Sequence, residues 1–422
     1  MDIEAYLDGF DERDWATGVD GTVRIAVAGL GWWTTDMALP AIAEVDNCEA
    51  TVAVSGDPEK AERVADRFAM DAAITYEGFH DGAATDAYDA VYVCTPNATH
   101  LELCASAADH GAAVLCEKPM EADSERARRL VEACRSVPLM VAYRMHTEPT
   151  IRRARDLLRA GTIGDPVAVH GHMSQRLLEM IPDPDQWRLD PALAGPGTSV
   201  TDLGIYPINT ARFVLEADPV RVAASAGSPN DGFENVPDER AAFLVEFDDG
   251  CRATCMASQN ASRSGGFRVV GTEGELVLEP AFFADESRTL TVARGEQRIE
   301  TTAPTVDQMG EEFAYFADRV LSGEPAGGYP SKPEPGTTDS RAGSHFSVAV
   351  TQTGTWTDAP ARNHTSSPSV AACGTEVTRG SRSGRHSPGP MPPGRRPSCS
   401  TCGNWSCRCS TPTRTRPATH PT

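Results

Sequence analysis

Hydrophobic residues in the first third of the chain form short continuous runs instead of alternating with polar residues. Four runs rich in Val and Ala predict strands at residues 23–28, 50–54, 90–94 and 112–116. Apolar residues at helical spacing follow the first three runs, at residues 36–45, 59–68 and 99–110. Strands that are apolar on both faces, joined by helix-length crossovers, are typical of a parallel sheet covered on both sides. Residues 1–145 are therefore predicted to form a Rossmann domain, a doubly wound α/β dinucleotide-binding fold.

The pattern changes from Pro166 onward. Short turn sequences such as Asp248-Asp249-Gly250 now connect the candidate strands, at residues 167–172, 241–247, 251–257, 267–270 and 275–279. Short connections indicate antiparallel neighbours. Helical patterns accompany them at residues 150–160, 206–215 and 308–321. Residues 146–325 are predicted to form an α+β domain built on an open, mostly antiparallel sheet.

The last part of the chain has a different composition. From Tyr329 it contains no leucine and no isoleucine, and it is dense in Pro, Ser, Thr, Gly and Arg. Such a segment buries too little apolar surface to offset the entropy of ordering it, so residues 326–422 are predicted to be a low-complexity tail, disordered or aberrant. Its cysteines include one CxxC pair, but zinc modules usually separate their ligand pairs by a dozen residues or more. No metal site is predicted at Cys399, Cys402, Cys407 and Cys409.

Charge divides the chain in the same place. Of its 38 basic and 60 acidic residues, residues 329–422 hold 11 and 4, which leaves 27 and 56 for residues 1–328. An acidic body repels nucleic acid and anionic membranes, so neither is an expected partner. Only three of the basic residues are lysine. An acid-rich, lysine-poor surface suits high salt, although GC-rich coding would also favour arginine over lysine.

No apolar run is long enough for a membrane span or the core of a secretory signal. A soluble, cytoplasmic protein is expected. Seven cysteines lie in apolar or helical stretches without metal-ligand spacing, so we interpret them as core residues in a reducing compartment. They are Cys48, Cys94, Cys104, Cys116, Cys134, Cys251 and Cys255.

A glycine-rich turn follows the first predicted strand. In a GxGxxG turn the first glycine allows the tight bend, the second lets the backbone approach a pyrophosphate and the third allows close helix packing. The sequence here is Gly29-Leu30-Gly31-Trp32-Trp33-Thr34, with threonine in the third place. An ordinary strand-to-helix turn is the alternative, but the position before the first helix favours dinucleotide binding.

The end of the second strand bears on which dinucleotide binds. An acidic residue there would hold the free ribose of NAD, whereas Ser55-Gly56, with Lys60 and Arg63 on the next helix, suits the 2′-phosphate of NADP. Asp57 is the contrary observation, because it could act as a displaced ribose ligand. NADP is the predicted cofactor.

Lys118 follows the fourth strand, in Glu117-Lys118-Pro119. Dinucleotides bind outside the carboxyl ends of parallel strands, so this ammonium is expected near the nicotinamide, where it would lose some proton affinity and could steer a substrate hydroxyl. The alternative is a lysine that pairs with Glu117 at the edge of a loop.

Several motifs in order resemble one known family. Glu117-Lys118-Pro119, Thr95-Pro96-Asn97 with His100, and Asp202-Leu203-Gly204-Ile205-Tyr206 are similar to motifs of the glucose-fructose oxidoreductase and inositol dehydrogenase family. Ser55-Gly56-Asp57-Pro58 resembles its NADP-binding turn. Three further stretches resemble the NADP-dependent D-xylose 1-dehydrogenases of salt-loving archaea, at residues 31–33, 143–149 and 182–188. The resemblance covers about residues 1–325.

This resemblance implies a catalytic set of Lys118, Tyr206 and Asp202. Hydride would pass from C1 of a pyranose to the nicotinamide, and Tyr206, activated by Lys118, would accept the hydroxyl proton. Asp202 would orient the sugar or the lysine. The alternatives are a helix N-cap for Asp202 and a half-buried core aromatic for Tyr206.

Further contacts are expected around these three residues. Candidate sugar contacts are Arg144, His146, Trp187, Arg188, Asp202 and Tyr206. Asn97 and His100 could reach the nicotinamide ribose. The candidate cofactor-binding residues are Gly29, Leu30, Gly31, Trp32, Trp33, Ser55, Gly56, Lys60, Thr95, Pro96, Asn97, His100, Glu117 and Lys118.

The function expected from sequence is an NADP-dependent aldose 1-dehydrogenase that oxidises D-xylose, or D-glucose, to the lactone. A polyol or dihydrodiol dehydrogenase of the same family is one alternative. A non-catalytic NADP-sensing regulator is another, although such regulators generally lack the lysine. The family suggests that the open sheet of residues 146–325 serves substrate binding and assembly into a homodimer or homotetramer.

Overall fold

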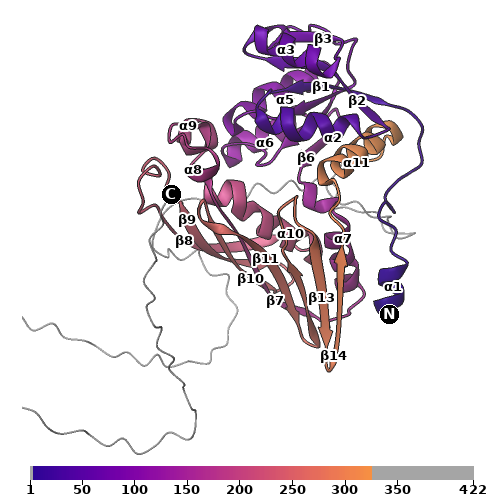
Figure 1. Ribbon diagram of the computed structural model, residues 1–422, viewed down its shortest axis with the longest axis vertical. Helices are drawn as coiled ribbons and strands as arrows, with labels where there is room; N and C mark the ends of the chain where they lie inside the picture. The colour runs from indigo at the N-terminus through magenta and orange to yellow at the C-terminus, as the bar shows by residue number, and fades with distance from the viewer. Residues whose placement is uncertain (1–2, 326–422) are drawn as a thin grey trace, which may run out of the picture. The chain divides into compact units, whose positions relative to one another are not determined.

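The computed structural model describes residues 3–325 (Figure 1). The predictions made above for the tail and its cysteines lie outside the described residues. Within residues 3–325 two sheets are present, one of six strands and one of eight.

The first sheet is parallel throughout and has the strand order β3-β2-β1-β4-β5-β6. Its strands are β1 (Val23–Ala28), β2 (Cys48–Ser55), β3 (Ala72–Thr75), β4 (Ala90–Val93), β5 (Ala113–Glu117) and β6 (Leu139–Ala142). The four predicted strands are the four central ones, and the two edge strands, each of four residues, were not predicted. The order reverses between β1 and β4, which is where doubly wound sheets bind their ligands.

Helices cover both faces of this sheet. They are η1 (Thr34–Ala38), α2 (Leu39–Ala43), α3 (Pro58–Phe68), α4 (Tyr76–His80), η2 (Asn97–Thr99), α5 (His100–Asp109) and α6 (Ser124–Ala133). Side chains of α4, α5 and α6 pack in one core with Ala26 and Val91. The opposite core joins Val27 and Tyr92 to α2 and α3, and also to α11 (Gln308–Ser322). Although α11 follows the second sheet in sequence, Phe313 and Phe316 bury its apolar face against the first sheet.

The second sheet has the order β14-β13-β12-β11-β7-β10-β9-β8. Its strands are β7 (Pro166–Arg176), β8 (Pro219–Gly227), β9 (Arg240–Phe247), β10 (Arg252–Ser258), β11 (Asn260–Gly271), β12 (Gly274–Glu279), β13 (Arg288–Arg294) and β14 (Gln297–Ala303). All neighbouring pairs are antiparallel except β7 and β10. Antiparallel pairing of neighbours in sequence, expected from the short connections, is therefore wrong between β10 and β11, because β7 lies between them. The long helical connection after β7 leads to the edge strand β8, and β9 and β10 then follow in turn until β10 lies parallel to β7.

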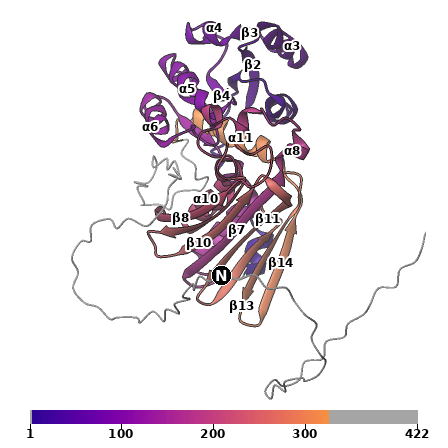
Figure 2. The ribbon, with the colours of Figure 1, turned by 90° about the vertical axis from the view of Figure 1, so that its left-hand side faces the viewer.

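Helices α7 (Pro149–Arg159) and α10 (Ile205–Leu215) pack on one face of this sheet, as Figure 2 shows for α10. Shorter elements lie between β6 and α7 and between β7 and α10. They are η3 (Arg144–His146), α8 (Leu177–Met180), η4 (Trp187–Leu189), α9 (Pro191–Ala194) and η5 (Val200–Gly204).

The N-terminal segment links the two halves. Helix α1 (Ile3–Asp8) packs on the core of the second sheet, and the Tyr6 hydroxyl donates a hydrogen bond of 2.9 Å to Asp156 on α7. Further along, the Trp15 ring meets Tyr315 of α11 edge to face, with 5.3 Å between centroids. Residues near the start of the chain thus contact both domains.

The described residues contain neither a membrane-spanning helix nor a cluster of metal ligands. No helix among residues 3–325 combines the length and the apolar character that crossing a bilayer requires. Across the same residues, no three His, Cys, Asp or Glu side chains are grouped to hold a metal ion. The seven cysteines named above are free thiols, and all except Cys94 are buried.

Candidate functional site

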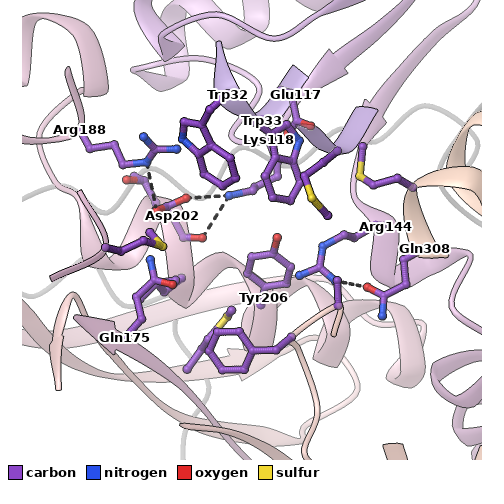
Figure 3. A pocket seen from close by; sticks show the side chains of 18 of the residues that line it. Trp32, Trp33, Glu117, Lys118, Arg144, Gln175, Arg188, Asp202, Tyr206 and Gln308 are labelled. Atoms are coloured by element: carbon purple, nitrogen blue, oxygen red, sulfur yellow. Dashed lines mark hydrogen bonds and ion pairs between the residues drawn. The ribbon is translucent and has the colours of Figure 1, made fainter. Parts of the chain in front are cut away.

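A cavity of about 1130 Å³ opens at the carboxyl ends of β4 and β5 (Figure 3). One wall comes from the first domain and includes Trp32, Trp33 and Lys118. The other wall comes from η5, α10 and β7, and includes Asp202 and Tyr206. The parallel sheet therefore brings its strand ends, and the second domain its helix α10, to one place.

The glycine-rich turn lies beside this cavity. Gly29 has φ +94°, and a Cβ there would stand 2.2 Å from the carbonyl oxygen of Cys94, so only glycine fits. A Cβ on Gly31 would meet nothing within 4 Å. The Thr34 hydroxyl donates a 2.7 Å hydrogen bond to the Gly29 carbonyl and is buried, so it closes the turn from the place of the third glycine.

Lys118, Asp202 and Tyr206 meet across the two domains. The Lys118 ammonium donates hydrogen bonds to Asp202 Oδ1 at 2.8 Å and to the Asp202 carbonyl at 3.2 Å. The same Nζ lies 5.2 Å from the centroid of the Tyr206 ring. In Figure 3 the Tyr206 hydroxyl points into the cavity toward Trp33 and Lys118, and among the described residues it has no hydrogen-bond partner. The phenol is thus free to meet a ligand.

Electrostatics keep this lysine charged. Burial alone would lower the pKa of Lys118, but the attraction of Asp202, Tyr206 and Glu117 outweighs burial and raises that pKa above its ordinary value. The expectation that Lys118 loses proton affinity is therefore wrong. Burial raises the pKa of Asp202, but Lys118 and Arg188 with the hydrogen bonds to that carboxylate lower it to about 2. Both members of the pair are ionised at neutral pH.

The end of β2 lies outside this cavity, because Ser55, Gly56 and Lys60 are not among the residues that line it. Ser55 Oγ accepts a hydrogen bond of 3.1 Å from the Asp57 backbone N–H, and Asp57 Oδ1 accepts one of 3.1 Å from the Lys60 N–H. Asp57 is thus the N-cap of α3, so one of its oxygens is already used. Gly56 is exposed and Lys60 is half-buried beside it.

Several predicted cofactor contacts have other surroundings. Both ring nitrogens of His100 lie against backbone carbonyls, of Thr95 at 2.9 Å and Met120 at 3.2 Å, so His100 ties two strand ends together. The Asn97 amide donates to the Ala194 carbonyl at 2.9 Å while lining the cavity. Leu30 is a core residue of the first domain, and Pro96 is not among the residues that line the cavity. Thr95 and Glu117 do line it.

Of the predicted sugar contacts, some line the cavity and one is packed away from it. Trp187 and Arg188 line the cavity, with the guanidinium stacked 4.5 Å from the Trp187 ring centroid and 3.6 Å from Asp202 Oδ2. Arg144 is buried at the cavity, over the Tyr206 ring at 4.9 Å, and is bonded to Gln308 and the Phe282 carbonyl. His146 is packed away from the cavity between Tyr143 and Phe213. We therefore leave His146 out of the sugar-binding set.

Comparison with known protein families identifies the family of this chain. A family described as "Oxidoreductase family, NAD-binding Rossmann fold" matches residues 23–144, and "GFO/IDH/MocA C-terminal domain" matches residues 151–277. This chain belongs to the GFO/IDH/MocA oxidoreductase family. The resemblance inferred from its motifs is confirmed, as is the fold of a Rossmann domain followed by an open, mostly antiparallel sheet.

Among relatives in this family, one is named D-xylose 1-dehydrogenase [NADP(+)], from Haloarcula marismortui. It is 52% identical over 327 residues, covering 76% of this chain and 91% of the relative. The D-xylose 1-dehydrogenase (NADP(+)) 2 of Haloferax volcanii is 33% identical, covering 73% and 89%. A solved structure of the aldose-aldose oxidoreductase from Caulobacter crescentus, complexed with glycerol, matches with a TM-score of 0.67 at 28% identity, covering 73% and 92%.

Other cavity residues of this GFO/IDH/MocA protein were not foreseen from the sequence. Gln175 on β7 and Gln308 at the start of α11 line the cavity, as do Met173, Phe283 and Asp307. No local motif marks them, because they approach the site only through the pairing of the second sheet and the return of α11 to the first.

Proposed function

We propose that this protein is an NADP-dependent aldose 1-dehydrogenase that oxidises a pyranose at C1 to the lactone. D-xylose is the proposed preferred substrate, with D-glucose as the second. The observation that carries the proposal is the Lys118–Asp202 ion pair beside the free Tyr206 hydroxyl, in a cavity at the carboxyl ends of a Rossmann sheet. Sequence similarity to two D-xylose 1-dehydrogenases supports the choice of sugar.

The residues present fit a dinucleotide. Gly31 leaves open space where a phosphate would approach the backbone, and the Trp33 Nε1 donor is buried at the cavity without a hydrogen-bond partner among the described residues. Gly29, Gly31, Trp33, Thr95 and Asn97 would hold it. When bound, the oxidised nicotinamide accepts a hydride from the sugar.

NADP is proposed over NAD from the end of β2. Ser55 and Lys60 provide a hydroxyl and a cation, and Asp57 is engaged as an N-cap. The names of the two D-xylose 1-dehydrogenases also specify NADP(+).

The chain's own residues would manage the proton. Oxidation of the C1 hydroxyl releases a proton, and Tyr206 Oη is the free group facing the cavity that can accept it. A phenol is a weak base at neutral pH, so the ammonium of Lys118 near the ring is needed to stabilise the developing phenolate. Asp202 holds that ammonium in place through the 2.8 Å contact. Arg188 and Trp187 offer a cation and a flat apolar face to the sugar ring.

A substrate panel tests the proposal. Purified protein in molar salt is given NADP with D-xylose, D-glucose, inositol or a dihydrodiol, and NADPH absorbance is followed. Formation of NADPH with the aldoses supports the proposal. Activity with the dihydrodiol or inositol alone would favour a polyol or dihydrodiol dehydrogenase, and binding of NADP without turnover of any compound would favour a regulator.

Two substitutions test the assigned roles. Lys118→Ala and Tyr206→Phe should each lower kcat/KM by about two orders of magnitude or more, the usual effect of losing a positioned acid–base group. Arg128→Ala, on an exposed position of α6, is the control. Near-normal turnover in either variant would refute the role given to that residue.

The cysteines and the exposed apolar residues support a proposed compartment and oligomeric state. Free buried cysteines fit a reducing, cytoplasmic compartment. The second sheet exposes Val167, Leu244 and Met256, which fits assembly into a homodimer or homotetramer. Size-exclusion chromatography with light scattering tests this, and a monomer would contradict it.

A further inference from the structure

Asp202 is held from both of its carboxylate oxygens. Oδ1 accepts from the Lys118 ammonium at 2.8 Å, and Oδ2 accepts from Gln259 Nε2 at 2.8 Å. Arg188 lies farther away, with its Nε 3.6 Å from Oδ2. Gln259 is therefore the only described residue that donates a direct hydrogen bond to Oδ2 from its side chain, and the mechanism above does not use it.

Gln259 is rigidly placed. It lies between β10 and β11 with a relative exposure of 0%. Its backbone N–H donates to the Glu239 carbonyl and to Ser199 Oγ, both at 3.0 Å, and its carbonyl accepts from the Leu177 N–H at 2.8 Å. Because hydrogen bonds hold both its backbone N–H and its carbonyl, Gln259 has a fixed backbone from which its side-chain amide reaches Asp202.

Gln259 also contacts a second amide, that of Gln175. Gln175 Nε2 donates to Gln259 Oε1 at 3.0 Å. Gln175 is half-buried on β7 and lines the cavity, where Figure 3 shows it below Asp202. Its Oε1 and its second N–H have no hydrogen-bond partner among residues 3–325. An amide thus faces the cavity with one acceptor and one donor unused.

The charge of Asp202 sets the orientation of both amides. A carboxylate accepts and cannot donate, so Gln259 must turn its N–H toward Asp202 and its carbonyl toward Gln175. Gln175 must then turn its N–H toward Gln259, which leaves its carbonyl oxygen for the cavity. The chain of hydrogen bonds therefore presents an acceptor beside the lysine and aspartate pair.

We infer that Gln175 is a sugar-binding residue whose Oε1 accepts a hydrogen bond from a ring hydroxyl. Gln259 is the positioning residue that orients both Gln175 and Asp202. Through it, the sugar contact and the Lys118–Asp202 pair form one connected network. This inference rests on the proposed function, because it takes the cavity as a sugar site.

Kinetics of single variants test each role. Gln175→Ala should raise KM for D-xylose by about threefold to tenfold, the effect of losing one neutral hydrogen bond, with kcat close to that of the wild type. Gln259→Leu should lower kcat by about tenfold and move the acid side of the pH profile to higher pH, because Asp202 loses a bond that favours its charged form. Ser174→Ala, the neighbour of Gln175, is the control; its hydroxyl bonds the Ser262 carbonyl.

A second variant covers the case in which Gln259→Leu does not fold. Gln259→Glu keeps the side-chain volume but sets a second carboxyl against Asp202, so the acid side of the profile should move to still higher pH. Melting curves and quenching of tryptophan fluorescence by NADPH show whether each variant folds and binds cofactor. Gln259→Leu should also raise KM, because it removes the hydrogen bond that orients Gln175. The double variant Gln175→Ala with Gln259→Leu should therefore raise KM by less than the two single changes combined.

The outcomes separate the two proposals. If the wild type reduces no NADP with any aldose, the proposed function is overturned and this inference with it. If the wild type is active but Gln175→Ala has the wild-type KM, or a folded Gln259 variant keeps the wild-type pH profile, only the inference is overturned.

Discussion

At the scale of single residues, Asp202 decides the charge of the site. Burial on its own would lower the pKa of Lys118, and Asp202 exerts the strongest of the attractions that raise it. Lysine is almost absent from this chain, with arginine providing nearly all other positive charge. The compact ammonium of Lys118, at the end of a flexible side chain, contacts the Asp202 carboxylate and the Tyr206 ring at the same time.

Asp202→Asn tests this arrangement through pH. Without the negative charge, the pKa of Lys118 should fall, so the lysine loses its proton at lower pH than in the wild type. We expect kcat/KM to drop by at least about tenfold and the alkaline side of its pH profile to move toward neutrality. Asp123→Asn, at the N-cap of α6, is the control. An unchanged alkaline side would show that Asp202 does not keep the lysine charged.

At the scale of elements, the turn between β1 and η1 separates two uses of glycine. Gly29 is required by its φ of +94° and by the Cys94 carbonyl, whereas Gly31 faces open space. Gly29→Ala should destabilise the first domain by about 1–3 kcal/mol or more. Gly31→Ala should leave the melting temperature near that of the wild type and weaken NADPH binding by about tenfold, or ~1.4 kcal/mol. Unchanged NADPH affinity in Gly31→Ala would contradict the placement of the cofactor.

Helix α11 carries a second testable feature, the buried carboxyl of Glu312. Burial and the nearby charge of Glu117 raise the pKa of Glu312 well above its ordinary value. The folded protein then holds a proton that the unfolded chain releases above pH ~4.3, so stability falls as pH rises past that value. Glu312→Gln removes this loss.

The Glu312→Gln variant should unfold at a higher temperature than the wild type at neutral pH, by an amount equivalent to about 1 kcal/mol or more. The gain should vanish below pH ~4, where the carboxyl is protonated in both states. Glu311→Gln, which breaks the ion pair with Arg13, should give no gain. A pH-independent effect of Glu312→Gln would contradict a protonated side chain.

The strands differ in how well the sequence alone predicts them. Continuous apolar runs identified β1 and the central strands, because strands buried on both faces need apolar side chains throughout. Strands β13 (RTLTVAR) and β14 (QRIETTA) were missed because polar residues interrupt them. The edge strands β3 and β6 were missed as well; each is only partly buried, whereas β4, of the same length, is buried throughout. The parallel pairing of β7 with β10 depends on a long-range return that no local pattern records.

The candidate site likewise contains residues that local motifs predict and residues that only the tertiary structure brings together. Lys118, Asp202 and Tyr206 stand in local motifs and were identified before the structure brought them together. Gln175 and Gln308 reach the cavity only through sheet pairing and helix packing, so no local motif marks them. His146 stands in a motif beside Arg144, yet its ring packs against Phe213, because sequence neighbours in η3 point in different directions.

At the scale of the whole molecule, charge repulsion within residues 1–328 should make stability depend on salt. Acidic residues there outnumber basic ones by 56 to 27. Raising the salt from about 0.1 M to 1 M shortens the screening length from about 10 Å to about 3 Å. We expect the melting temperature to rise across this range, and neutralising exposed acids, as in Glu234→Gln with Glu296→Gln, to reduce the dependence. A melting temperature indifferent to salt would favour GC-rich coding as the origin of the composition.

The most direct test of the central claim follows the hydrogen at C1. D-xylose carrying deuterium at C1 is incubated with the enzyme and NADP, and the reduced cofactor is analysed by mass spectrometry. The account predicts that the deuterium is found in the reduced nicotinamide and that the sugar becomes the lactone. Reduced cofactor without deuterium, or no reduction with any aldose, would contradict the claim that Lys118, Asp202 and Tyr206 form a site for oxidation at C1.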